Sequence, residues 1–351
     1  MLSKKQLDEI REHLERAQNP VFYFDNDADG LCSYLILRRL IGRGKGVAIR
    51  SFPELSASYA RKVQELNADY VFILDKPLVS KEFFADVETM NVPVVWIDHH
   101  EVEFNEGEHK NVFLFNPLRA KEKSEEPVTF IAYEVSKRKE DLWLAMIGCV
   151  SDHFIPPFAD EFAIMYPDFW GEVKTPAEAY FKTGVGNLGR TFNFGLKDST
   201  SNIVRLQNFL ISCNGPINVM EEVNGNHPLR KKYFELKKKY DVLLEKARRN
   251  YGQKVLYFEY GGELSISSDL SNELSFIYPK KYIIVAYKNG SVVNISLRGK
   301  GVKKILEIVL KEVEGSGGGH DDAVGARISV TNLEKFREVF ENKVVLTVKE
   351  I

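Results

Sequence analysis

The chain of 351 residues is long enough for about two domains of ordinary size. Its 48 Lys and Arg nearly balance 50 Asp and Glu, which gives a formal net charge of −2, and 44% of its residues are hydrophobic. This balance is typical of a globular protein. It excludes a disordered tail, a collagen-like chain and a uniformly basic nucleic-acid coat, but it leaves room for a local basic groove.

Short apolar segments alternate with helical segments over the first 150 residues. Unbroken apolar runs rich in β-branched and aromatic residues predict strands at 21–24, 47–52, 70–74 and 92–97. Helical spacing predicts helices at 1–18, 31–41, 58–66 and 80–90, another from about 127, and one at 141–150. Alternation of this kind predicts βαβ units, and strands buried on both faces read as continuous apolar runs. We therefore expect a parallel sheet covered by helices.

The sequence pattern changes after residue 153. Residues 154–250 are rich in aromatic residues and contain helical patterns at 201–213 and 229–251. Beyond them the predicted order is strands at 255–260, 282–287 and 291–297, a helix at 302–313, a glycine-rich loop, a helix at 332–341 and a strand at 344–348. An Asn289-Gly290 turn joins two of these strands as a hairpin. The expected fold class is α/β, with an N-terminal parallel-sheet domain (1–153), a helical insertion or linker (154–252) and a smaller α/β C-terminal domain (253–351).

The chain contains no pattern of a membrane or secreted protein. Its longest apolar runs are of strand length, far below the roughly 18 residues of a spanning helix. Its first residues are charged throughout and lack the apolar core of a signal peptide. Cys32, Cys149 and Cys213 are too few and too scattered for a disulfide framework or a zinc site. We expect a cytoplasmic protein with no membrane partner, whose cysteines are small buried hydrophobic residues.

Acidic residues and histidines follow several predicted strands. The carboxyl ends of parallel strands meet at one edge of an open α/β sheet, so these side chains should converge there. Clustered carboxylates repel one another unless a cation lies between them, and mixed carboxylate and imidazole ligands suit Mn²⁺ or a related ion. Each motif alone is more often a solvated loop or a helix cap. Together they predict a metal site formed by Asp25, Asp27, Asp29, Asp75, Asp98, His99, His100 and Asp152.

These motifs resemble those of a known family. Asp25-Asn26-Asp27-Ala28-Asp29-Gly30, Asp75, Asp98-His99-His100 and Asp152 are similar to the four motifs of the DHH phosphoesterases, and the first looks most like that of the RecJ-type nucleases. The oligoribonuclease and pyrophosphatase branches usually have a histidine where this chain has Tyr23. The resemblance covers residues 20–152 and about 255–351. It is to the short, archaeal type, without the oligonucleotide-binding-fold domain of bacterial RecJ proteins.

The glycine-rich element near the C-terminus extends the resemblance. Gly317-Gly318-Gly319-His320, followed by Ala323-Val324-Gly325-Ala326, resembles a motif of the C-terminal domain that accompanies DHH domains. Ser296-Leu297-Arg298 looks like that domain's Ser-x-Arg. A run of glycines lets backbone N–H groups approach a phosphate closely, and a guanidinium fork suits a phosphate contact. The alternatives are a plain flexible loop for the glycines and a surface salt bridge for Arg298.

The resemblance implies a role for each motif residue. Asp25 and Asp27 would hold one divalent ion, with Asp29, His99 and Asp152 holding a second and Asp75 bridging the two. His100 would contact the scissile phosphate, and Asp98 would orient a histidine. Mn²⁺ would be the preferred ion, with Mg²⁺ as the other candidate. The substrate-binding residues implied for the chain end, besides His100, are Arg298, Gly318, Gly319 and His320.

We therefore expect a metal-dependent exonuclease that hydrolyses single-stranded DNA or RNA in DNA repair or replication. The alternative is a phosphodiesterase for very short oligonucleotides or cyclic dinucleotides. A non-enzymatic replication scaffold has little weight, because every motif residue is present.

A basic segment lies between the two predicted α/β domains. Residues 228–254 carry ten Lys or Arg and three acids, a net charge of +7. This segment either binds along a phosphate backbone or is the solvated face of a linking helix. Replication or repair proteins are expected partners, and the aromatic insertion (154–252) is a candidate homo-oligomer contact. Cleavage polarity and the choice between DNA and RNA stay open.

Overall fold

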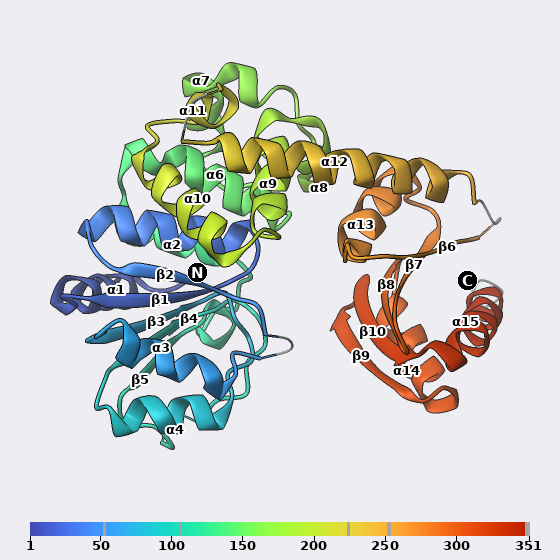
Figure 1. Cartoon of the computed structure of the whole chain (residues 1–351), viewed down its shortest axis with the longest axis horizontal. Helices are drawn as coiled ribbons and strands as arrows, with labels where there is room; N and C mark the ends of the chain where they lie inside the picture. The colour runs from blue at the N-terminus through green and yellow to red at the C-terminus, as the bar shows by residue number, and fades with distance from the viewer. Residues whose placement is uncertain (52–53, 106, 223–224, 251–253, 348–351) are drawn as a thin grey trace. The chain divides into compact units, whose positions relative to one another are not determined.

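The computed structural model describes residues 1–51, 54–105, 107–222, 225–250 and 254–347. The chain divides into two compact units, Met1–Tyr233 (unit 1) and Phe234–Ile351 (unit 2), each containing a five-stranded sheet. Figure 1 shows the elements of each unit in chain order. An α/β fold with a parallel sheet, many helices and a smaller second sheet domain agrees with the predicted fold class.

Unit 1 is built on a parallel sheet with the strand order β2-β1-β3-β4-β5. Its strands are aligned so that Phe24 of β1 pairs with Leu74 of β3, which pairs with Ile97 of β4. The carboxyl ends of these three strands therefore lie side by side. The sequence patterns did not predict β5, which has only four residues. The strands are β1 (Pro20–Asp25), β2 (Lys45–Ile49), β3 (Tyr70–Leu74), β4 (Val94–Ile97) and β5 (Val112–Phe115).

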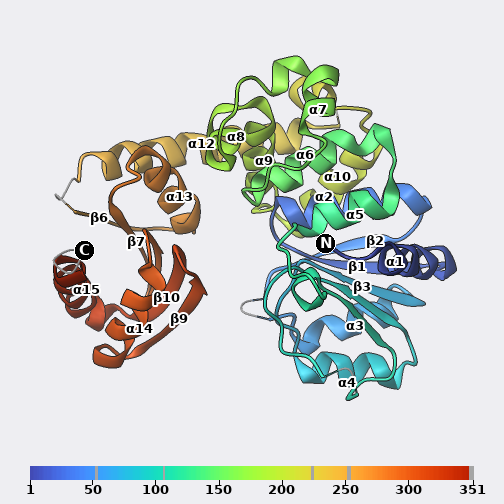
Figure 2. The ribbon, with the colours of Figure 1, turned by 180° about the vertical axis from the view of Figure 1, so that it is seen from behind.

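Helices cover both faces of this sheet. Phe22 and Phe24 of β1 enter the core shared with α1, α2, α5 and α6, whereas Val21 and Tyr23 enter the core shared with α3 and α4. Figures 1 and 2 show α3 and α4 on one side of the strands and α2 on the other. The helices are α1 (Lys4–Arg16), α2 (Ala28–Ile41), α3 (Ala60–Glu65), α4 (Lys81–Thr89), α5 (Val128–Ser136) and α6 (Leu142–Ser151).

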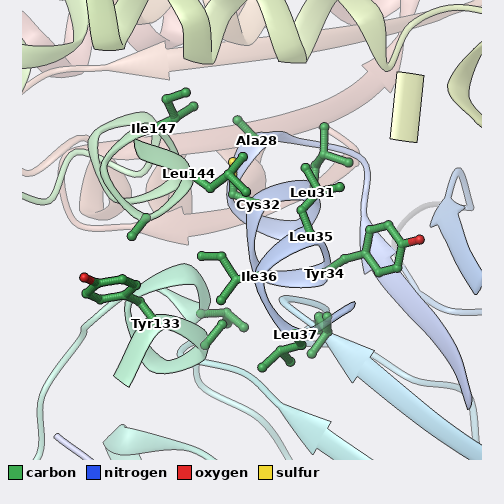
Figure 3. Packing of buried hydrophobic residues seen from close by; sticks show 14 of the residues in the cluster. Ala28, Leu31, Cys32, Tyr34, Leu35, Ile36, Leu37, Tyr133, Leu144 and Ile147 are labelled. Carbon is green, nitrogen blue, oxygen red and sulfur yellow. The ribbon is translucent and has the colours of Figure 1, made fainter. Parts of the chain in front are cut away.

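Helix α2 is the centre of the larger core. Figure 3 shows its buried face, including Leu35 and Ile36, packed toward Tyr133 of α5 and Leu144 of α6. The Asp25-x-Asp27-x-Asp29 motif leads into this helix. Asp27 caps the helix by accepting a hydrogen bond from Gly30 N at 2.9 Å, and Asp29 lies in its first turn. The acidic motif is therefore anchored on a helix whose first ten residues are all buried.

The segment after residue 153 is helical, and its side chains share the core of unit 1. Arg39 of α2, which a buried ion pair with Asp141 at 2.6 Å holds in place, joins this segment to the rest by donating a hydrogen bond to Cys213 O at 2.7 Å. The helices are α7 (Ala159–Met165), α8 (Pro176–Lys182), α9 (Gly184–Gly195), α10 (Thr200–Ser212) and α11 (Ile217–Met220). Helix α12 (His227–Arg248) begins in unit 1 and ends in unit 2.

Unit 2 contains a mixed sheet with the order β6-β7-β8-β10-β9. Strands β6 and β7 are parallel, the other neighbours are antiparallel, and the predicted hairpin at Asn289-Gly290 joins β7 to β8. The elements are β6 (Val255–Gly261), α13 (Ser267–Ile277), β7 (Tyr282–Asn289), β8 (Val292–Arg298), α14 (Val302–Glu312), β9 (Gly315–His320), β10 (Ala323–Ser329) and α15 (Leu333–Thr347).

Two predictions for unit 2 are wrong. The glycine-rich segment is not a loop but edge strand β9, which is held by β10 across a tight turn. The strand predicted at 344–348 is the end of α15 as far as Thr347, and Val348 lies outside the described residues. Phe336, Phe340 and Val344 recur every four residues and are all fully buried, so the apolar pattern there is helical.

The described residues agree with two further expectations. Cys32, Cys149 and Cys213 are buried free thiols. Burial raises the pKa of the Cys213 thiol to about 11, so this thiol stays protonated and unreactive. Within the described ranges, no helix combines the length and the apolar character that crossing a bilayer requires.

Candidate metal centre

The acidic and histidine residues of unit 1 lie where its parallel strands end. Asp25 is the last residue of β1, Asp75 directly follows β3 and Asp98 directly follows β4. Asp75 has φ of 59°, a left-handed conformation that is uncommon outside glycine, and its N–H donates to Ile97 O at 3.0 Å. This sharp turn is fixed by the neighbouring strand. The predicted convergence of these residues at one sheet edge is therefore observed.

His99 is the central residue of the cluster. Its Nε2 lies 3.5 Å from Asp75 Oδ1 and 3.5 Å from Asp152 Oδ2, although Asp152 comes from the end of α6. Two groups of three side chains offer ligand atoms within 4.8 Å of one another: Asp75, His99 and His100, and Asp29, His99 and Asp152. The groups share His99, so a single compact centre brings together the ends of β3, β4 and α6 and the first turn of α2.

The backbone of α5 holds Asp29 in place. Its two carboxylate oxygens accept hydrogen bonds from Val128 N at 3.0 Å and Thr129 N at 2.8 Å, which are buried N–H groups of the first turn and have no partner within that helix. Thr129 Oγ1 also donates to Asp29 O at 2.9 Å. His99 Nδ1 lies 3.4 Å from Glu125 O, an arrangement that leaves Nε2 as the acceptor for a cation. The sequence did not reveal these supporting contacts, because the partners of Asp29 lie 99 and 100 positions away and the partner of His99 lies 26 positions away.

The donor atoms fit a divalent cation. Asp75 Oδ1 and His99 Nε2 are buried and have no hydrogen-bond partner among the described residues, although both point into the same cluster. Burial first, and then the charges of Asp29 and Asp27, raise the pKa of Asp75 well above its usual range. A cation offsets both effects, and oxygen and imidazole donors suit Mn²⁺ and Mg²⁺.

The pKa values of two neighbouring carboxylates are raised in the same way. Burial, followed by the charges of Asp25 and Asp29, raises the pKa of Asp27 to about 8. Burial, followed by the charge of Asp29, raises the pKa of Asp152 to about 8, although its side chain is 39% exposed. Without a cation, part of the cluster therefore stays protonated near neutral pH.

The two histidines differ in their protonation. Burial lowers the pKa of His99, which keeps this imidazole neutral and suited to metal binding. For His100, burial also acts to lower the pKa, but the hydrogen bond and the charge of Asp98 outweigh it and raise the pKa to about 9. Asp98 Oδ1 accepts from His100 N at 2.7 Å and lies 3.3 Å from His100 Nδ1. Asp98 thus orients His100 as a protonated donor.

Lys76 is a residue of this centre that the sequence reasoning missed. Its side chain is only 6% exposed, and its Nζ lies 3.0 Å from Asp25 Oδ1. Asp25 is in neither group of clustered ligand atoms. The only signal in the sequence was the position of this lysine directly after Asp75, which says nothing about its partner.

Arg298 is packed in unit 2 among neutral groups. It donates from Nε to Asn272 Oδ1 at 2.6 Å, from Nη2 to Ser268 Oγ at 3.1 Å and from Nη1 to Leu297 O at 2.8 Å. Within the described part of the chain Arg298 forms no ion pair, and the nearest opposing charge that acts on its pKa is that of Asp269. Burial lowers its pKa to about 10, which still leaves the guanidinium charged at neutral pH.

The glycine-rich strand β9 is exposed along its whole length and forms the edge of its sheet. A Cβ at Gly319 would lie 2.5 Å from Ala323 O, and its φ of 140° also requires glycine. Gly318 has open space where a side chain would be, and His320 is the last residue of the strand. The backbone N–H groups at this open sheet edge can therefore hydrogen-bond to a ligand without steric hindrance from side chains.

The comparisons with known proteins agree with this architecture. Residues 252–345 match the DHHA1 domain. No curated protein sequence matches the chain. RecJ from Thermus thermophilus in complex with Mn²⁺ is 13% identical with a TM-score of 0.69, over 97% of this chain and 54% of that one. This chain therefore corresponds to about half of that RecJ.

Two other solved structures match over most of both chains. The DHH domain of a member of the s1p family of ribosomal proteins is 14% identical with a TM-score of 0.69, over 97% of this chain and 89% of that one. An exonuclease RecJ bound to manganese is 15% identical with a TM-score of 0.65, over 98% and 95%. The chain therefore has the fold of the RecJ and DHH-domain structures and carries a DHHA1 domain at residues 252–345, in agreement with its resemblance to the DHH family.

Proposed function

We propose that this protein is a metal-dependent exonuclease that hydrolyses phosphodiester bonds of single-stranded DNA or RNA, with a role in DNA repair or replication. The observation that carries the proposal is the compact cluster around His99, in which buried Asp75 Oδ1 and His99 Nε2 have no hydrogen-bond partner among the described residues. The solved RecJ structures with the same fold were determined with Mn²⁺ or Mg²⁺.

We assign the ligands to two divalent ions, with Mn²⁺ preferred and Mg²⁺ as the alternative. Asp29, His99 and Asp152 would hold one ion, Asp25 and Asp27 the other, and Asp75 would be shared. When bound, such an ion pair supplies an activated water and stabilises the negative charge that develops at phosphorus and on the leaving oxygen.

The chain's own residues prepare the substrate for this chemistry. His100, held protonated by Asp98, can donate a hydrogen bond to the scissile phosphate. Thr129 and Glu125 keep Asp29 and His99 at fixed positions. Because these contacts involve backbone atoms of one segment, they hold the ligands in place before any substrate binds.

We assign nucleotide binding in unit 2 to Arg298, Gly318, Gly319 and His320. Arg298 is a charged guanidinium whose hydrogen bonds described above all go to neutral groups, which favours an anionic ligand such as a phosphate. The open backbone of β9 offers N–H donors in the same sheet, one strand beyond β10, which pairs with the strand of Arg298. Binding of a chain end by Arg298 and the β9 backbone favours cleavage from that end over internal cleavage.

We further propose that the helical segment mediates self-association. Large apolar side chains are exposed on it, which is typical of interaction surfaces. Sedimentation of a monomer at micromolar concentration would contradict this assignment. The exposed residues are Ile164, Met165, Val204, Ile217 and Met220. Replication or repair proteins are candidate partners for the same surface.

The test is digestion of single-stranded DNA and RNA 20-mers, labelled at either end, with Mn²⁺ or with a chelator. We expect stepwise shortening from one end that requires the metal ion, and the labels report its polarity. A dinucleotide and a cyclic dinucleotide are included at equal phosphodiester concentration. Faster cleavage of these small substrates would favour the phosphodiesterase alternative, and no Mn²⁺-dependent hydrolysis of any substrate would refute the proposed function.

A further inference from the structure

Lys76 places a positive charge inside the metal centre. Its Nζ donates to Asp25 Oδ1 at 3.0 Å and lies 3.5 Å from Ser51 O, and its side chain is 6% exposed. Burial of an ammonium group is costly unless an anion lies beside it. Asp25 is the carboxylate that meets this need, so the two side chains stabilise each other in the ion-free protein.

The backbone around Lys76 leaves it little freedom. The preceding residue, Asp75, has a left-handed backbone conformation, and Lys76 O accepts a hydrogen bond at 3.0 Å from the indole of Trp96, which is itself buried. Asp25 is one residue beyond the pairing of Phe24 with Leu74, on the strand next to β3. The position of the ammonium group follows from the sheet register and is not that of a loosely placed surface lysine.

The ligand atoms divide unevenly around this ammonium group. Asp29, His99, Asp152 and Asp75 contribute to groups of close donor atoms, whereas Asp25 does not, and one of its oxygens is occupied by Lys76. A divalent ion that uses Asp25 must displace the ammonium group or share the carboxylate with it. Within the described ranges no Lys or Arg pairs with Asp29, His99 or Asp152, so an ion that these three hold has no such competitor there.

We propose that Lys76 is a built-in cation that competes with a divalent ion for Asp25. It makes the ion on the Asp25 side the more weakly bound of the two, and it neutralises the acidic centre when that ion is absent. This inference rests on the proposed metal-dependent function. Its consequence is that the weaker ion, and hence hydrolysis, responds to the free concentration of divalent metal rather than being permanently saturated.

Calorimetric titration of the full chain with Mn²⁺, without substrate, tests the inference. In Lys76→Met the competitor is lost, so the weaker ion should bind about 10- to 100-fold more tightly, the range expected for a hydrogen bond between charged groups. The tighter ion should change little. Lys76→Arg should remain close to the wild type because it keeps the charge. Lys62→Met is the matched control, since Lys62 is an exposed lysine of the same unit that pairs with Glu65.

Thermal unfolding provides a second measurement. With a chelator present, Lys76→Met should unfold at a lower temperature than the wild type, because Asp25 has lost its cation, and Mn²⁺ should raise its unfolding temperature by more than it raises that of the wild type. If Lys76→Met does not fold, Lys76→Gln, which keeps a hydrogen-bond donor without the charge, should fold and show the same tightening.

The outcomes separate this inference from the proposed function. Equal Mn²⁺ affinities of the wild type and Lys76→Met for both ions would overturn the role of Lys76 while leaving metal-dependent hydrolysis intact. A fall in unfolding temperature with unchanged Mn²⁺ affinities would also overturn it, because the pair would then be purely structural. Absence of Mn²⁺ binding in both proteins would refute the inference and the proposed function together.

Discussion

Gly148→Ala should weaken metal binding although Gly148 is not a ligand. Gly148 lies in α6 against α5, and a Cβ there would lie 2.2 Å from Thr129 Oγ1 and 2.7 Å from Thr129 Cβ. Thr129 is fully buried and holds Asp29 through its N–H and its hydroxyl. The added methyl group must therefore move Thr129, and Asp29 must move with it.

The magnitude follows from two opposing terms. Replacing a helical glycine by alanine gains about 1 kcal/mol of helix propensity. Overpacking a buried contact costs about 1–3 kcal/mol, and an overlap this close between two buried helices belongs at the upper end. The net loss of about 2 kcal/mol lowers the unfolding temperature of a unit of this size by roughly 4–8 °C. Displacing a residue that orients a ligand lowers metal affinity by about 10- to 100-fold.

Differential scanning fluorimetry in chelator and calorimetric titration with Mn²⁺ measure these two effects. Gly107→Ala is the matched control, because Gly107 has open space where a Cβ would be. The control should retain the unfolding temperature and the Mn²⁺ affinity of the wild type. If Gly148→Ala also kept both values, the close packing of α5 on α6 could not be what positions Asp29, and the reasoning would be refuted.

Three further predictions concern the ligands, the nucleotide contact and pH. Asp75→Asn should lose Mn²⁺ binding and lower hydrolysis by about 1000-fold, since several kcal/mol of charge stabilisation are lost, and retained activity would contradict the shared-ligand assignment. In chelator its unfolding temperature should equal or exceed that of the wild type, because a neutral amide replaces a carboxyl group whose ionisation burial and its neighbours oppose. Arg298→Ala should raise KM about 10- to 100-fold and leave kcat within about threefold of the wild type in steady-state assays with an RNA or DNA 20-mer. Circular dichroism checks that the variant is folded, and a fall in kcat alone would argue against a binding role. The chelator-treated protein should become less stable as pH rises from about 4 to about 8, because Asp27 and Asp152, with folded pKa values of about 8, keep protons that their unfolded forms have already released near pH 4. Unfolding temperatures at pH 5.5 and pH 8 measure this effect, and Mn²⁺ should stabilise the protein more at pH 8. A higher unfolding temperature in chelator at pH 8 than at pH 5.5 would contradict the expected direction.

The parallel sheet and the convergence of its acidic ends were predictable from local patterns. Strands such as β3 are unbroken apolar runs, and the carboxylates that directly follow the runs of β1, β3 and β4 identify the sheet edge at which they lie. Strand β5 escaped prediction because no helix separates it from β4, so it breaks the alternation of strands and helices on which the prediction rested. The glycines of β9 have poor strand propensity, and only the neighbouring β10 makes them a strand.

The supporting part of the site was not predictable. Thr129 reaches Asp29 across about 100 residues, and Lys76 pairs with Asp25 across about 50, so neither contact has a local signature. Propensity and spacing report on neighbours in sequence, whereas these contacts depend on how α5 and β3 pack in three dimensions. The identities of the ligands follow from the motifs, but what holds and neutralises them follows only from the fold.

The composition of β9 also bears on solubility. An exposed sheet edge usually templates the addition of strands from other molecules, which leads to aggregation. A glycine strand resists this because each residue loses much conformational entropy on pairing and offers no side chain to stabilise the added strand. The edge of unit 2 can therefore stay open to a transient hydrogen-bonding ligand without becoming a nucleus for fibrils.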